Sequence, residues 1–337
     1  MSANFSYCIA NYLFDKSNIC LSEELVFIFG GCYHLSLRSK SSGHVVNNRY
    51  LSELNDSVHI SNSNHLAIQN FTSTLGAVLR VEPRNPSRDI KWIVEDYLAD
   101  RNYKTLVTLP STILESPSSN LLSNQNLWAL MSPESLTAGS SIDGVLNIEL
   151  TKERVLRRSS KSILEIWKDQ VSNRILGPNR FKIIPPVYHD LKIAKKILLK
   201  NALMRMYLSL NTGNFNIGPN IFVLLRENLK KNPSVKNIQD HRKILSEAIS
   251  DSDFAREDYM GRKYASHCFE TVGLKEGIDS LIHIADSLLS SHEVWKSAIL
   301  ELICPKKSIT AKDLLDMYWN LENSEREILN RLKQTLV

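Results

Sequence analysis

The hydrophobic pattern changes character about halfway along the chain, and this change limits the possible folds more than any other feature. Short apolar runs typical of strands occur before Thr151, whereas after it the apolar residues recur at helical spacing. Helices that lead into a small sheet are typical of an α+β domain. We therefore predict an α+β domain over residues 1–175 and an all-helical domain over 188–337, with a proline-containing linker between them.

The first half is predicted to mix helices and strands. Helices are expected at 5–14, 23–30, 65–75 and 89–98, and strands at 76–81, 104–109, 127–131 and 144–150. The last two strands are predicted to pair in antiparallel fashion. The polar segments 36–65 and 110–125 are interpreted as loops, and 152–171 as a helix.

The second half carries helical periodicity and helix-start signals. Thr310-x-x-Asp313 and Ser324-x-x-Glu327 have the spacing of capping boxes, and they predict the starts of the last two helices. Long apolar and aromatic side chains at helical spacing are expected in the core rather than around a cofactor: Met204, Met206, Tyr207, Trp295, Tyr318 and Trp319.

Composition excludes several function classes. Apolar content of 43% and charged content of 23% are ordinary for a globular protein. The net charge of +5 is spread along the chain, so no nucleic-acid partner is expected. No apolar run is long enough to span a bilayer, and the five cysteines contain no CxxC pair. We expect a cytoplasmic protein without a membrane partner.

Histidines gather in one polar segment, but not in a metal-binding pattern. The spacings between His34, His44, His59 and His65 match no compact ligand motif. We therefore expect no metal, and no cofactor motif is recognised elsewhere in the chain.

Cys8 is the best candidate for a nucleophile. Ser6 is a plausible N-cap, which would place Cys8 in the first turn of a helix. There the positive end of the helix dipole favours the thiolate, the reactive form of cysteine. The alternative is that Cys8 is a small buried apolar residue on an amphipathic helix.

Several landmarks lie in a familiar order along the chain. Cys8 is followed by Ser22-Glu23 and by Gly30-Gly31, and then by Leu75-Gly76 with the strand at 104–109. Two segments of the helical half also match, Met204 to Gly218 and Phe254-Ala-Arg256-Glu-Asp-Tyr259. In these features the chain resembles the butirosin biosynthesis protein H family. That resemblance implies a papain-like N-terminal domain followed by a helical C-terminal domain.

The resemblance also implies an activity. The family's namesake is an acyltransferase that moves an acyl group from a carrier-protein thioester to an aminoglycoside amine. Cys8 would accept the acyl group, with a histidine as base and a carboxylate to orient it. The implied partners are an acyl carrier protein and an amine acceptor. We also expect a homodimer, or a complex with another biosynthetic protein.

The chain departs from the family at the histidine. No histidine occurs between His65 and His189, and Asn126 (or Asn124) stands where the family's base is expected. An amide cannot take up a proton near neutral pH.

Three explanations remain open for the missing histidine. Another histidine, His34 or His44, supplies the base; the amine reacts without one; or the domain is a catalytically silent binding or scaffold subunit. For the active case we predict Cys8, His34 and Glu23 as catalytic residues. The predicted substrate-binding residues are Asn126, Gly30, Gly31 and Tyr33.

Overall fold

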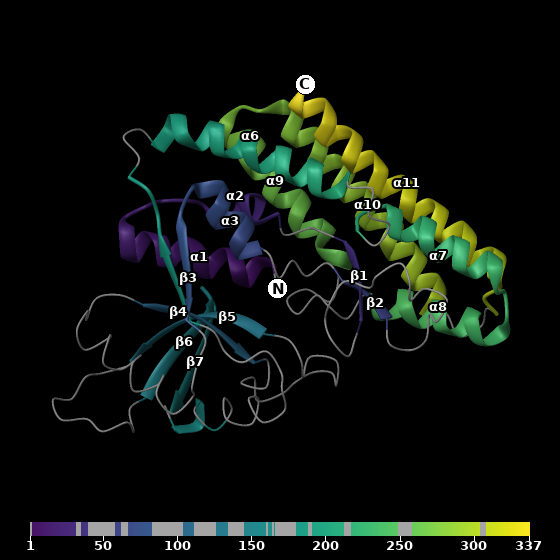
Figure 1. The fold of residues 1–337 in the computed structure, drawn as a ribbon, viewed down its shortest axis with the longest axis horizontal. Coiled ribbons are helices and arrows are strands. Elements are labelled where there is room, and N and C mark those ends of the chain that lie inside the picture. The colour runs from purple at the N-terminus through teal and green to yellow at the C-terminus, as the bar shows by residue number, and fades with distance from the viewer. Residues whose placement is uncertain are drawn as a thin grey trace. The chain divides into compact units, whose positions relative to one another are not determined.

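The computed structural model divides the chain into two compact units (Figure 1). The first comprises Met1–Val26 and Phe71–His189, and the second Phe27–Asn70 and Asp190–Val337. The residues that the structure describes are 2–31, 35–39, 58–61, 67–82, 104–110, 126–133, 145–159, 161–163, 165, 180–187, 191–211, 217–248, 258–303 and 308–337.

The first unit is built on a six-stranded antiparallel sheet in the order β3-β8-β4-β5-β6-β7. Helix α1 contacts strands β4, β5 and β6 of this sheet. The bounds of these elements are α1 Ser2–Ser17, β3 Val78–Glu82, β4 Thr105–Pro110, β5 Asn126–Pro133, β6 Val145–Thr151, β7 Arg154–Ser159 and β8 Arg180–Ile184.

Alternating side chains of the central strands form the core of the first unit. In β6, Leu146, Ile148 and Leu150 are buried at every second position, as expected for a strand with one face covered. Phe5 of α1 packs edge-on against Trp128 of β5, with ring centroids 5.3 Å apart. The apolar face of α1 thus covers the middle of the sheet.

The second unit is a bundle of helices with a small two-stranded sheet. Helix α10 packs against both α9 and α11, and α11 also contacts α6 and α7 (Figure 1). The bounds are β1 Ser36–Ser39, β2 Val58–Ser61, α6 Leu191–Leu210, α7 Asn220–Lys231, α8 Val235–Glu247, η4 Tyr259–Gly261, α9 Arg262–Glu276, α10 Asp279–Ile303 and α11 Ala311–Leu336. Two further helices, α2 (Glu23–Gly30) and α3 (Ala67–Leu75), are divided between the units.

Strands β1 and β2 belong to the helical unit because their side chains join its core. Leu35, Leu37, Val58 and Ile60 are buried in the same cluster as the helices α7, α8, α10 and α11. A backbone hydrogen bond also links this small sheet to the helices: the Gly218 N–H, just before α7, donates to the carbonyl oxygen of Leu35, just before β1, over 2.9 Å. We expected the first domain as one continuous range, 1–175. The observed division is discontinuous, because strands β1 and β2 pack with the helices and Phe27–Asn70 belongs to the second unit.

The mixed α+β architecture with an antiparallel sheet and a helical C-terminal region is confirmed. The predicted antiparallel pair is β5 and β6, in which Leu130 pairs with Glu149 and Met131 with Ile148. The capping box at Thr310 and Asp313 is also present, with both reciprocal hydrogen bonds.

Four strands lie where other structure was predicted. Strands β1 and β2 fall within segment 36–65, which was interpreted as a loop. The helix predicted over 152–171 is wrong at its start, because β7 forms a tight hairpin with β6 there. Strand β8, in the expected linker, pairs with both β3 and β4. Strand β8 pairs with strands that are distant in sequence, and β7 follows β6 after a two-residue turn. Helical periodicity in the sequence indicates neither pairing.

Three local predictions in the helices are also wrong. Ser6 lies inside α1 and is buried, so it is not an N-cap. Ser324 lies inside the continuous α11, where its hydroxyl donates to the Leu321 carbonyl oxygen. Met204 and Trp319 were expected in the core, but both are exposed. Among the described residues, no helix combines the length and apolar character needed to cross a lipid bilayer.

Candidate functional site

Cys8 lies in the second turn of α1, not the first, because the helix begins at Ser2. Its side chain is fully buried between α1 and the sheet of the first unit. Cys8 lies beyond the first four helical residues, whose N–H groups have no partner within the helix. The dipole argument for a reactive thiolate therefore does not apply to Cys8.

The described contacts of the Cys8 thiol are with backbone and amide groups. The thiol donates toward the carbonyl oxygens of Glu149 and Leu150, at 3.8 Å and 3.9 Å from Sγ. The side-chain nitrogen of Asn4 approaches Sγ at 3.7 Å. None of these described contacts is with an imidazole, so they supply no group that would take the thiol proton.

The electrostatic surroundings favour the neutral thiol. Burial is the main cause that raises the pKa of Cys8 well above its usual value, and the carboxylates of Glu149 and Glu23 add to it. Lys104, which pairs with Glu149 at 2.6 Å, opposes the rise. The pKa of the adjacent Tyr7 is raised to about 12, again mainly by burial. The direction at Cys8 is thus opposite to that of an activated nucleophile.

Asn4 is the residue that sequence reasoning missed at this site. Its side-chain nitrogen donates to the carbonyl oxygens of Trp128 and Leu150, each over 2.6 Å, and its oxygen accepts from Trp128 N–H over 2.7 Å. The β5–β6 ladder begins only at Leu130. The Asn4 amide therefore satisfies backbone groups of β5 and β6 that have no partner strand there.

No signal in the sequence singles out Asn4, because its importance depends on strands more than 120 residues away. A buried side-chain amide with all its donors and its acceptor engaged fixes the helix on the sheet. The polar centre of this unit is thus a structural joint between α1, β5 and β6.

The other predicted site residues are placed as follows. Glu23 opens α2 and is close enough to Cys8 to raise its pKa; the pKa of Glu23 itself is raised by burial and by Glu24. Gly30 ends α2 and Gly31 follows it with φ of 61°, and both belong to the second unit.

Of the three remaining predicted residues, the structure gives the backbone position of one. Asn126 is the first residue of β5 and pairs with Pro110 of β4 through the backbone register. Tyr33 and His34 lie outside the described residues. The set that the structure brings together is therefore Cys8 with Glu23.

A second polar cluster lies in the helical unit, and its centre is a buried ion pair. Arg262 of α9 donates from Nε and Nη2 to the two carboxylate oxygens of Glu325, each over 2.8 Å. Oε1 of Glu325 also accepts from Ser291 Oγ at 2.9 Å and from Trp295 Nε1 at 3.0 Å. This arrangement ties α9, α10 and α11 together at one point.

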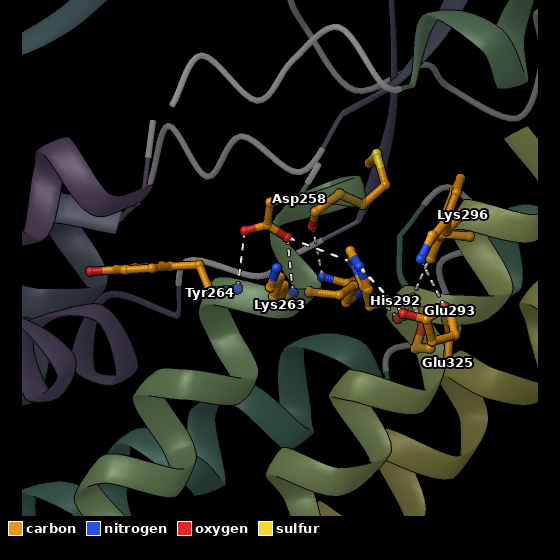
Figure 2. Close-up of polar contacts among 11 residues, drawn as sticks. Asp258, Lys263, Tyr264, His292, Glu293, Lys296 and Glu325 are labelled. Carbon is orange, nitrogen blue, oxygen red and sulfur yellow. Dashed lines mark hydrogen bonds and ion pairs between the residues drawn. The ribbon is translucent and has the colours of Figure 1, made fainter. Parts of the chain in front are cut away.

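Asp258 lies beside this ion pair and caps α9 (Figure 2). Its two oxygens accept from the backbone N–H groups of Lys263 and Tyr264, at 2.9 Å and 3.0 Å. This is the favoured place for a carboxylate, at the positive end of the helix dipole. Gly261, just before α9, has φ of 68°, a conformation that glycine adopts without strain.

His292 of α10 lies between two carboxylates (Figure 2). Its Nδ1 is 4.0 Å from Asp258 Oδ1, and its Nε2 is 3.8 Å from Glu293 Oε1. Burial lowers the pKa of His292, while Asp258 and Glu293 act in the opposite direction. The hydrogen bonds and ion pairs of this cluster join α9, α10 and α11, and we assign it a structural role.

Within the described ranges, no group of three or more His, Cys, Asp or Glu side chains is arranged to hold a metal ion. Neither a scan against models of known protein families nor a search among curated proteins found a match for this chain.

Proposed function

We propose that this chain is a catalytically silent binding or scaffold subunit of a biosynthetic complex. We further propose that its first unit is a papain-like domain related to the butirosin biosynthesis protein H family. The observation that carries the proposal is the environment of Cys8, which is fully buried and whose pKa is raised.

Acyl transfer through cysteine has two physical requirements. The sulfur must be reachable by a thioester, and the thiol must lose its proton to a base or ionise by itself. The thiol of Cys8 instead donates to two backbone carbonyls of β6. A thioester would reach this sulfur only if α1 separated from the sheet, which would also break the three hydrogen bonds of Asn4.

The loss of the family's histidine supports the same proposal. Asn126 is found at the start of β5, where the family resemblance expects that histidine. A domain in which an amide stands in place of the family's histidine, and whose cysteine serves packing, keeps its fold for another use. Binding a partner protein or a carrier-protein substrate is a use that needs no base.

The test is the rate of alkylation of each cysteine by iodoacetamide, read by peptide mass spectrometry in the folded and the urea-unfolded protein. Cys20 is an exposed internal reference, and Cys268 is a buried one. We expect Cys20 to react in the folded protein, and Cys8 to react only after unfolding, as Cys268 does. Alkylation of Cys8 in the folded protein at neutral pH, faster than that of Cys20, would overturn the proposal.

The second candidate is the cysteine-dependent acyltransferase, favoured by one observation. Ionisable groups surround Cys8 as they would in a reactive centre, with Glu23 and Glu149 both close enough to raise the pKa of Tyr7 and of Cys8. The base predicted for an acyltransferase is His34. Incubation with an acetyl thioester of N-acetylcysteamine, followed by intact mass measurement, separates the two functions. Acyltransfer requires an acetyl adduct that Cys8→Ala abolishes and Cys20→Ala retains.

A further inference from the structure

Helix α6 has an unusual charge distribution for a surface helix. Its sequence, LKIAKKILLKNALMRMYLSL, contains no aspartate or glutamate. The basic residues are Lys192, Lys195, Lys196, Lys200 and Arg205. The helix therefore carries a positive field with no anion on the same element to compensate it.

One face of α6 packs inside the second unit. The buried positions recur three and four residues apart, as expected for the apolar face of an amphipathic helix. These residues are Leu198, Leu199, Ala202, Leu203, Met206 and Leu210. Contacts with α11 account for part of this burial.

The opposite face of α6 carries a second apolar stripe. Ile197, Met204 and Leu208 have exposed fractions of 58%, 38% and 57%. They are spaced by seven and four residues, so at about 100° per residue they project within a narrow sector of the helix. Because these three side chains are exposed, packing of the core does not require them to be apolar.

Cations border this stripe on both sides. At about 100° per residue, Lys196 and Lys200 lie along one edge and Arg205 along the other. All three side chains are exposed. The stripe from Ile197 to Leu208 is roughly 16 Å long, given a rise of 1.5 Å per residue. This length equals three turns of a helix laid alongside α6.

We propose that the exposed face of α6, formed by Ile197, Met204 and Leu208 with their flanking cations, docks an acidic amphipathic helix of a partner protein. The inference rests on the proposed binding-subunit function and names its partner class. Apolar side chains of the partner cover the stripe, and its carboxylates pair with Lys196 and Lys200. This is the helix-on-helix mode of peptide recognition, with charge complementarity that sets the orientation.

The positive charges and the small size of the apolar stripe favour an acidic helix over two other partners, a second copy of the chain and a membrane surface. A second copy of the chain that presented the same face would place cations against cations, which disfavours self-pairing. A membrane surface would favour aromatic residues and a wide apolar face. The stripe consists of three apolar side chains without an aromatic, and the buried apolar side chains of the helix pack inside its own unit.

Methionine-methyl NMR provides a direct test, because α6 carries one methionine on each face. Met204 is on the exposed stripe and Met206 is buried on the opposite side. The probe is a capped peptide helix with leucines along one face and glutamates on both flanks; its control carries lysines in place of the glutamates. We expect the acidic peptide to shift the Met204 methyl resonance, with much smaller changes at Met206, and the basic peptide to shift neither.

Two matched pairs of variants make the test specific. Lys196→Glu/Lys200→Glu is expected to weaken binding of the acidic peptide about tenfold, because two exposed ion pairs become repulsions. Lys231→Glu/Lys236→Glu, which changes exposed lysines of α7 and α8, is expected to leave it unchanged. Leu208→Gln is expected to weaken binding, whereas Leu300→Gln, at a residue of α10 that is similarly exposed (53%), is not.

Other outcomes overturn the inference. A Met204 resonance that the acidic peptide does not move, or that both peptides move equally, excludes the acidic helix. Response only to phosphatidylcholine vesicles that contain phosphatidylserine assigns the face to a membrane instead. The cysteine alkylation test is read separately: an inert Cys8 with an unresponsive Met204 removes this surface and leaves the binding-subunit function, whereas a reactive Cys8 removes that function.

Discussion

The two units bury polar groups by different means. In the helical unit, the carboxylate of Glu325 meets four donors from Arg262, Ser291 and Trp295, so a full charge pair is buried and satisfied. In the first unit the centre is neutral, and the amide of Asn4 makes short hydrogen bonds beside a thiol with only long contacts. In both units the buried polar side chains connect secondary-structure elements. An ion pair connects helices in the helical unit, and a side-chain amide connects a helix to the sheet in the first unit.

Buried titratable groups also determine how the stability of each unit depends on pH. In the first unit, the raised pKa values of Cys8 and Tyr7 mean that the unfolded chain loses these protons before the folded one does. Stability of that unit is therefore lost as pH rises above about 9. In the helical unit, burial raises the pKa of Tyr318, which acts in the same direction at high pH. That unit also holds His241, whose lowered pKa means that stability is lost as pH falls. Buried methionines report on the units separately: Met131 on the first, and Met260 and Met317 on the second.

The largest expected effect comes from breaking the ion pair. Glu325→Gln leaves the guanidinium of Arg262 buried without its counter-charge, and we expect a loss of about 3–5 kcal/mol in the free energy of unfolding. The measurement is urea unfolding followed at the Met260 and Met317 methyl groups. Glu227→Gln removes an exposed partner of Lys230 and is the control, expected to cost under about 0.5 kcal/mol. Equal, small losses in both variants would contradict the role of the ion pair.

The second expected effect is a pH dependence confined to the helical unit. His241 is fully buried; its Nε2–H donates to Asn228 Oδ1 over 3.0 Å, and its Nδ1 accepts from the Tyr318 hydroxyl over 2.8 Å. Burial lowers the pKa of His241 from 6.5 to about 4.

Between these two pH values the unfolded chain binds a proton at His241 and the folded one does not. Stability is therefore highest above pH 6.5 and falls by about 3 kcal/mol in total on acidification through pH 4. The same methyl-detected unfolding, repeated from pH 7.5 to pH 4, measures this slope. His241→Leu is expected to reduce the slope, leaving the smaller one from His292, whose pKa is also lowered. An unchanged slope in His241→Leu would show that another group titrates.

The smallest of the three effects concerns the joint in the first unit. Asn4→Ala leaves backbone groups of Trp128 and Leu150 without partners, and we expect a loss of about 2–3 kcal/mol, seen at the Met131 methyl. Asn11→Ala is the matched control on the same helix. Its amide donates only to the Tyr7 carbonyl oxygen, so a loss under about 1 kcal/mol is expected. A similar loss in both variants would mean that Asn4 does not join α1 to the sheet.

The alkylation rates of Cys8 and Cys268 in the Asn4→Ala variant compare the two units in a second way. If the Asn4 amide holds α1 on the sheet, its removal allows α1 to open and Cys8 to react with iodoacetamide faster than in the unchanged protein. Cys268, in the other unit, is expected to keep its rate. Faster reaction of both cysteines would indicate general loosening instead of local opening.

Much of the fold was predictable wherever neighbouring residues decide it. The helical core positions Phe222, Leu225 and Leu229 follow the helical period and are buried. The candidate site was predictable only in part: Cys8 was found as a conspicuous residue, but its burial and its partners were not. Asn4 could not be found, since an asparagine near a helix start has no distinctive local pattern.

The sequence by itself determined the mixed architecture, the β5–β6 pair, the helical second half and the Thr310 capping box, because periodicity and capping act within a few residues. Only the tertiary structure decided that β8 lies between β3 and β4, that strands β1 and β2 pack with the helices, and that the Cys8 thiol contacts β6. These features depend on backbone and side-chain contacts between distant segments. Such contacts are set by which apolar faces are buried together, and no local pattern encodes that choice.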